Sequence, residues 1–83
     1  MNELQLNIIS DEIQYYLGAK EHNKKAQHAV IDIGEIENHI SNLIMVLTGK
    51  EFYIDNEFDA LDYNAPKEIF QEEVKTILSS LLP

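Results

Sequence analysis

The chain has 83 residues, with 15 acidic residues against 6 lysines, no arginine and no cysteine, and its formal net charge is −9. A folded chain of this size buries about 63% of its surface, which is enough for one small core and a single domain over residues 1–83. The absence of cysteine excludes disulfides, zinc–thiolate sites, iron–sulfur clusters and thiol nucleophiles. The negative charge argues against nucleic acid or an anionic membrane as partner and permits a basic protein.

Neither a membrane span nor a secretory signal is expected from the apolar pattern. No apolar run approaches the roughly 18 residues that a spanning helix needs. The first residues are Met1, Asn2 and Glu3, which lack the basic start of a secretory signal. We therefore expect a cytoplasmic location.

The first predicted element is a helix over residues 3–17. Its apolar face is indicated by residues that recur at steps of three and four, namely Leu6, Ile9, Ile13 and then Tyr16 or Leu17. Asn2 is a suitable N-cap, and Gly18 is a suitable C-terminal stop. The polar residues 19–25 fit either a connection or the exposed start of the next helix.

The second predicted helix covers residues 25–48 and ends at Gly49. Its apolar residues follow at steps of four and three, as in a packed helical seam: Ala29, Ile33, Ile36, Ile40, Leu43 and Leu47. Gly34 weakens this helix by up to about 1 kcal/mol relative to alanine. We expect a continuous helix, with a break near Asp32–Gly34 as the alternative. The seam also permits a homodimer through the helix around Ala29–Leu47.

Residues 50–65 lack a sustained period and predict a loop with a short turn around Phe58–Leu61. Pro66 fits the first turn of a last helix, with Asn64 or Ala65 at its cap. The apolar face of that helix is formed by Phe70, Val74, Ile77 and Leu81. Together these elements predict an all-α fold, a small antiparallel three- or four-helix bundle.

Most of the net charge lies in one part of the chain. Residues 51–73 hold eight acids and one lysine, for a net charge of −7. Acids alternate there with aromatic residues, a pattern that suits a basic protein surface because charge speeds association and an aromatic anchor supplies affinity. The candidate partner-binding residues are Tyr53, Asp55, Glu57, Asp59, Asp62 and Tyr63. The alternative is a solvated loop whose aromatics close the core. Phe52 and Phe58 are expected in the core, and Tyr53 and Tyr63 at the surface.

The sequence contains two sets of residues that could be metal ligands, and we expect neither to bind a metal ion. Asp55–Ala60 resembles the first half of a calcium-binding EF-hand loop, but Ala60 replaces the turn glycine and Pro66 the bidentate glutamate. A second set lies at helical spacing: His28, Asp32, Glu35 and His39. One straight helix presents its ligands in a line and cannot surround a tetrahedral ion, so pairing at i,i+4 is favoured instead. No cofactor is expected either.

Enzymatic activity is also not expected from this sequence. The serines stand in no nucleophile-elbow motif, and three glycines do not form a phosphate-binding loop. With 15 acids, pairs of carboxylates arise by chance and do not indicate a glycosidase. We therefore expect a non-catalytic binding protein.

The C-terminal half resembles small, acidic, all-helical bacterial immunity proteins of the colicin type and of contact-dependent inhibition systems. The similar order is an amphipathic helix ending in Leu47–Gly49, the acidic aromatic stretch Asp55–Tyr63, and a closing helix at Phe70–Leu78. It is similar to the order in immunity proteins for colicin D-type transfer-RNA nucleases, and covers about residues 43–82. The resemblance implies that the acidic surface covers the active or RNA-binding cleft of a nuclease toxin domain. The alternative is a homodimeric regulatory or structural protein of a phage or mobile element.

Overall fold

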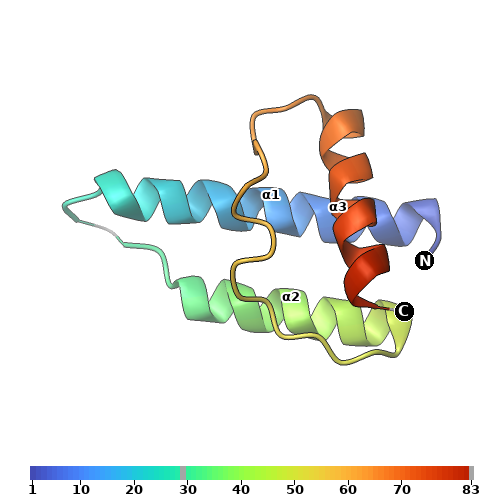
Figure 1. Ribbon diagram of the computed structural model, residues 1–83. Coiled ribbons are helices and arrows are strands. Elements are labelled where there is room, and N and C mark those ends of the chain that lie inside the picture. Colours follow the sequence, from blue (N-terminus) through green and yellow to red (C-terminus); the bar gives the residue numbers. More distant parts are fainter. Residues whose placement is uncertain (29, 83) are drawn as a thin grey trace.

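Three α-helices and the segments between them form the fold in the computed structural model, which describes residues 1–28 and 30–82. Helix α1 spans Glu3–Lys25, α2 spans Ile33–Thr48 and α3 spans Lys67–Leu81. No strand occurs within these described residues, and the predicted all-α fold is confirmed as a small three-helix bundle. α1 and α2 lie side by side and antiparallel (Figure 1). α3 crosses the N-terminal half of α1 steeply, and its C-terminal end comes near the C-terminal end of α2 (Figure 1). No helix in the described parts is long and apolar enough to span a membrane.

One core joins the three helices to the segment between α2 and α3. α1 packs against both other helices. The buried cluster contains Ile9, Ile13, Tyr16, Leu17, Ile40, Ile44, Ile54, Phe58, Phe70, Val74 and Leu78. Most of these residues belong to the predicted apolar faces, which confirms the helical periodicity. Ile54 and Phe58 come from the acidic segment, so the same stretch of chain supplies both charge and core.

The N-terminus of α1 is capped as expected, but its predicted end at Gly18 is wrong. The Asn2 side chain accepts a hydrogen bond from the Gln5 N–H at 2.8 Å, and Gln5 Oε1 accepts one from the Asn2 N–H at 3.0 Å. Gly18 remains helical within α1, and a Cβ there would lie at an ordinary contact distance of 3.7 Å from the Tyr63 ring. Residues 19–25 are therefore the last turns of α1. Their basic residues suit the negative end of the helix dipole.

The predicted continuous helix over 25–48 is also wrong, since α2 begins only at Ile33. The intervening connection is held by Asn23, whose amide nitrogen donates to the Ile31 carbonyl at 2.7 Å while its amide oxygen accepts from the Ile31 N–H at 2.9 Å. Asp32 then caps α2 by accepting from the Glu35 N–H at 3.2 Å. These local bonds compete with helix continuation. The break lies close to the alternative position at Asp32–Gly34.

The apolar seam of α2 faces the core of its own chain. Ile40 is fully buried, and Ile33, Ile36 and Leu47 pack against the buried cluster. Ala29, the first residue of the predicted seam, lies outside the described residues. The described seam residues Ile33, Ile36, Ile40 and Leu47 therefore pack within this chain, and the homodimer through this helix stays a prediction.

Gly49 ends α2 as predicted, and its backbone conformation gives a test. Its φ of +74° is left-handed, whereas Gly34 is helical and a Cβ there would meet only Asp32 Oδ1 at 3.5 Å. We expect Gly49→Ala to destabilise the chain by about 1 kcal/mol and Gly34→Ala to stabilise it by about 0.4–1 kcal/mol. Urea unfolding of the two variants measures both changes. Equal signs would contradict the assigned backbone conformations.

The segment from Lys50 to Pro66 has no regular secondary structure, and we call it the strap. The predicted short turn is confirmed by the Asp59 N–H donating to the Asn56 carbonyl at 3.2 Å and the Leu61 N–H to the Phe58 carbonyl at 3.1 Å. α3 begins one residue later than expected. Pro66 is its N-cap and makes no side-chain cap bond, so the predicted caps, Asn64 and Ala65, are wrong.

Candidate functional site

The strap lies across α1 and α2 and holds the predicted partner-binding residues (Figure 1). Three polar contacts attach it to the middle of α1. Tyr16 Oη lies 3.2 Å from the Asp55 carbonyl oxygen, Lys20 Nζ lies 2.6 Å from Asp59 Oδ1, and Gln14 Nε2 donates to the Tyr63 carbonyl at 2.7 Å. The strap backbone is thus held at several points along its length.

Apolar contacts beneath the strap hold it in the same position. Phe58 is 1% exposed and Ile54 is 8% exposed. Phe52 is partly buried against the core, and its ring meets the Phe58 ring edge-on with centroids 6.3 Å apart. The prediction that Phe58 is a core residue is confirmed, and Phe52 packs against the core while staying partly buried.

Tyr16 is the polar centre of this attachment. Its hydroxyl donates to Glu37 Oε2 at 2.8 Å, so one side chain of α1 contacts both α2 and the strap. Burial raises the pKa of the Tyr16 hydroxyl above its ordinary value, and the hydrogen bond to the Glu37 carboxylate and the nearby negative charges raise it further. Lys20 Nζ lies 5.0 Å from the centre of the Tyr16 ring, which adds a cation–π contact.

Three of the predicted binding residues have side chains exposed to solvent, where a partner could contact them. Tyr53 is 75% exposed, which makes it the most exposed aromatic side chain of the strap. Asp55 and Asp62 are also exposed. The Asp62 carboxylate accepts from the Asn64 N–H at 2.9 Å, which fixes its direction and leaves its second oxygen for another donor.

The other three predicted residues also have roles within the chain. Glu57 is half-buried and accepts from the Asp55 N–H at 2.8 Å, which closes the turn. Asp59 is ion-paired with Lys20. Tyr63 is half-buried over Gly18 rather than fully exposed. These three residues hold the strap in place, and this division of roles could not be seen in the sequence.

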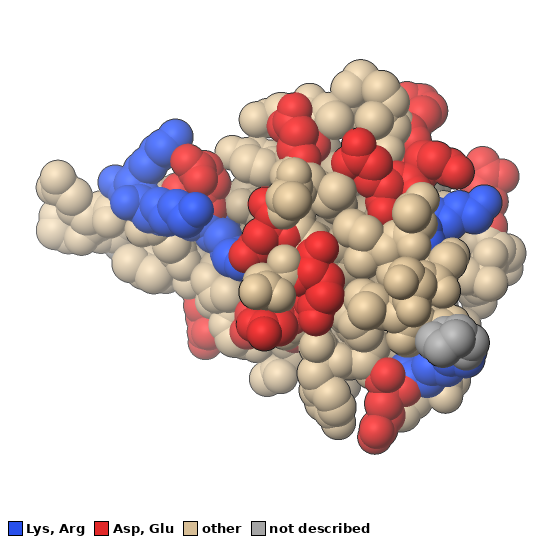
Figure 2. Space-filling view, in the orientation of Figure 1, with Lys and Arg blue, Asp and Glu red and all other residues tan. Residues whose placement is uncertain are grey.

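Charge is unevenly distributed on the face that the strap covers. Carboxylates gather over the strap in the centre of Figure 2 and over one end of α3, whereas lysines gather at the C-terminal end of α1. The α3 group consists of the exposed residues Glu68, Glu72 and Glu73. Of the lysines at the end of α1, Lys24 and Lys25 lie within ion-pair distance of Glu21. We call the strap together with the N-terminal half of α3 the acidic face.

The possible metal ligands are not brought together on one helix. His28 lies in the connection before α2, and Asp32 is the N-cap. His39 instead lies 3.8 Å from Glu12 of α1. In the part of the chain that the structure describes, no group of three or more His, Asp or Glu side chains is placed to hold a metal ion.

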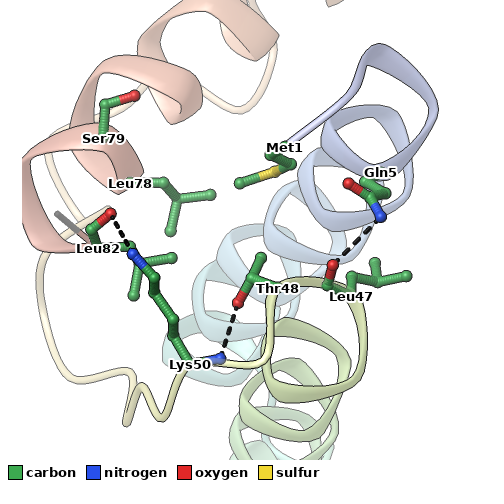
Figure 3. A pocket seen from close by; sticks show the side chains of 8 residues that line it. All are labelled: Met1, Gln5, Leu47, Thr48, Lys50, Leu78, Ser79 and Leu82. Atoms are coloured by element: carbon green, nitrogen blue, oxygen red, sulfur yellow. Dashed lines mark hydrogen bonds between the residues drawn. The ribbon is translucent and has the colours of Figure 1, made fainter.

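A cavity of about 270 Å³ lies where the N-terminus of α1 meets the ends of α2 and α3 (Figure 3). Three of its polar side chains donate hydrogen bonds to backbone carbonyls at or near helix ends. Gln5 donates to the Leu47 carbonyl at 3.2 Å, Thr48 to the Ile44 carbonyl at 2.6 Å, and Lys50 Nζ to the Leu82 carbonyl at 3.4 Å. The Gln5 and Lys50 bonds satisfy carbonyls at the C-terminal ends of α2 and α3. Among the described residues that line the cavity, Ser79 has neither a histidine nor a carboxylate beside it.

Sequence reasoning missed the residues of α1 that position the strap. Gln14, Tyr16 and Lys20 lie at steps of two and four, and their partners are 21 to 49 residues away in the chain. The i,i+4 spacing of Tyr16 and Lys20 was a usable signal. It was hidden because the predicted helix ended at residue 17.

No protein-family model, curated protein or solved structure matches this chain. The resemblance to immunity proteins therefore depends on the order of residues in the C-terminal half.

Proposed function

We propose that this chain is a non-catalytic binding protein whose acidic face docks onto a basic protein. The observation that carries this proposal is the exposed Tyr53 beside exposed carboxylates on an anchored strap. An anchored surface loses little conformational entropy on binding, so more of the contact energy becomes affinity. The carboxylates would guide a basic partner to the face, and the tyrosine would supply a buried anchor.

The partner that fits this chemistry best is a nuclease toxin domain. A nuclease binds phosphates through a basic cleft, and carboxylates held on a fixed backbone can occupy the same positions. The resemblance to bacterial immunity proteins points to the same class of partner and to a cytoplasmic inhibitor. In this proposal Asp55 and Asp62 replace phosphates and Tyr53 is the anchor. Glu57, Asp59 and Tyr63 act chiefly by holding the strap.

The proposal predicts a binding defect that depends on single surface residues. The test begins with the reading frames beside this one: a large protein with a basic C-terminal domain there supplies the probe, which is tested for binding and for rescue of cell growth on co-expression. We expect Tyr53→Ala to weaken binding by about 30-fold, as for an interface anchor worth about 2 kcal/mol. We expect Asp55→Lys to lower the association rate and to reduce its dependence on salt.

The matched control is Asp11→Lys, which makes the same change in charge at an exposed position of α1 outside the strap. Its effect on binding should be much smaller than that of Asp55→Lys. Binding that is insensitive both to salt and to Asp55→Lys would contradict the proposed mechanism. A domain that neither binds nor is neutralised would contradict the proposed partner.

A further inference from the structure

The α1–α2 pair has an exposed apolar stripe outside the strap and α3. On α1 it contains Leu4, Ile8 and Tyr15, which are 67%, 38% and 56% exposed. Steps of four and seven residues put these three side chains on one side of the helix. Val46 of α2 is 80% exposed. We call these four residues the outer stripe. Surface patches of this kind commonly mark an interaction site.

The register of the two helices places the residues of the outer stripe at different ends. Gln5 bonds to Leu47, Glu12 meets His39, and Tyr16 bonds to Glu37, so α1 and α2 are antiparallel with Glu12–His39 near the middle. Leu4, Ile8 and Val46 therefore lie toward one end and project from the surface. Tyr15 lies toward the other end.

A hollow lies beside Tyr15 at that second end. It has a volume of about 330 Å³, its apolar walls include Ile31 and Ile36, and Asp32 and Glu35 are among its polar residues. Glu12 and His39 also line it, on the side toward the middle of the pair. One end of the outer stripe thus has projecting aliphatic side chains, and the other end has a partly apolar hollow.

We propose that the outer stripe binds a second copy of this chain. A two-fold axis close to the Glu12–His39 pair would bring the projecting Leu4, Ile8 and Val46 of each copy onto the Tyr15 hollow of the other. This is the self-complementary arrangement that a symmetric dimer requires. The molecule measures 39 × 25 × 19 Å. A stable interface buries roughly 800 Å² per partner, so the contact would have to extend along most of the 39 Å length of the molecule.

The charge distribution also favours a second copy at this position. Eight of the 15 acids lie in residues 51–73, in the strap and α3. Around the outer stripe the ionisable residues include Asp11, Glu12, Asp32, Glu35 and His39, fewer acids than the eight of residues 51–73. Two chains of charge −9 can therefore approach through this side with less repulsion than through the acidic face. Both acidic faces would remain open, so the dimer does not depend on the proposed function.

Sedimentation equilibrium over a micromolar concentration series tests the proposal. We expect the wild-type chain to reach twice its 9.6 kDa mass. Val46→Glu should weaken the dimer by about tenfold or more, because it places a carboxylate in an apolar contact. Ile69→Glu is the matched control: Ile69 is 53% exposed on α3, away from the stripe. A monomeric wild-type chain, or a dimer disrupted by Ile69→Glu and not by Val46→Glu, would overturn the proposal.

A cross-linking measurement tests the position of the axis. Because the chain has no cysteine, any disulfide must come from an introduced residue. His39→Cys lies near the proposed axis and should form a symmetric disulfide between copies, whereas Glu73→Cys on α3 should not. Equal cross-linking of both variants, or cross-linking of Glu73→Cys alone, would overturn this geometry. Circular dichroism of each variant verifies that the helices are retained.

Discussion

Replacement of Phe58 with alanine is expected to destabilise the folded chain by about 3–5 kcal/mol. Phe58 is 1% exposed and is the largest apolar side chain that the strap contributes to the core. Its removal would leave a cavity where the strap meets the helices. A domain of 83 residues has a total stability of about 4–12 kcal/mol, so this loss is a large part of the whole. Urea unfolding followed by circular dichroism measures it.

Two further variants make the result interpretable. Phe58→Leu keeps most of the apolar volume and should lose much less stability, so it stays measurable if Phe58→Ala does not fold. Phe52→Ala is the matched control, because Phe52 is the edge-on neighbour of Phe58 and is only partly buried. A loss for Phe58→Ala no larger than that for Phe52→Ala would contradict the central position of Phe58.

Tyr16→Phe should cost about 1–3 kcal/mol although it removes only one oxygen. The Tyr16 hydroxyl is within hydrogen-bond distance of both Glu37 Oε2 and the Asp55 carbonyl. Without it, a half-buried carboxylate and a backbone carbonyl lose their shared donor. Tyr15→Phe is the natural control, because Tyr15 is the neighbouring tyrosine and is 56% exposed. Its stability should stay close to that of the wild-type chain.

Alkaline pH provides a second measurement on the same hydroxyl. The folded chain raises the pKa of Tyr16 above its ordinary value of 10.0, so above that pH the unfolded state loses the proton first. The stabilisation from Tyr16 is therefore complete below about pH 10 and declines as the pH rises further. We expect the difference in unfolding free energy between the wild-type chain and Tyr16→Phe to shrink in this range. A constant difference would contradict the raised pKa.

The acidic face shows how far a sequence can predict a candidate site. The position of the charge in residues 51–73 and the burial of Phe58 could both be read from the pattern of residue types. The division of work among the carboxylates could not. Asp59 is paired with Lys20, 39 residues away, and Glu57 closes a turn, whereas Asp55 is exposed. All of these residues are acidic, and they differ only in the residues that surround them in the folded chain.

Helix ends show the same contrast between local and distant causes. Asn2 caps α1 and Gly49 ends α2 as predicted, because both signals act through bonds or backbone conformation within one helical turn. Gly18 lies inside α1 next to the Tyr63 ring, and the helix continues through it to Lys25. A glycine therefore gives the same local signal at a helix end and inside a helix. The Tyr63 ring beside Gly18 is 45 residues away in the chain.

By itself the sequence determined the all-α class, the Asn2 cap of α1, the Gly49 end of α2, most of the apolar faces and the concentration of negative charge in the strap and α3. Each of these depends on residue type and on spacing within a few turns. Only the tertiary structure decided that the α2 seam faces its own core and that Leu4, Ile8, Tyr15 and Val46 are exposed. It also decided which acids the strap uses internally. These outcomes depend on contacts between residues far apart in the chain, because burial and pairing are set by how the helices and strap pack against one another.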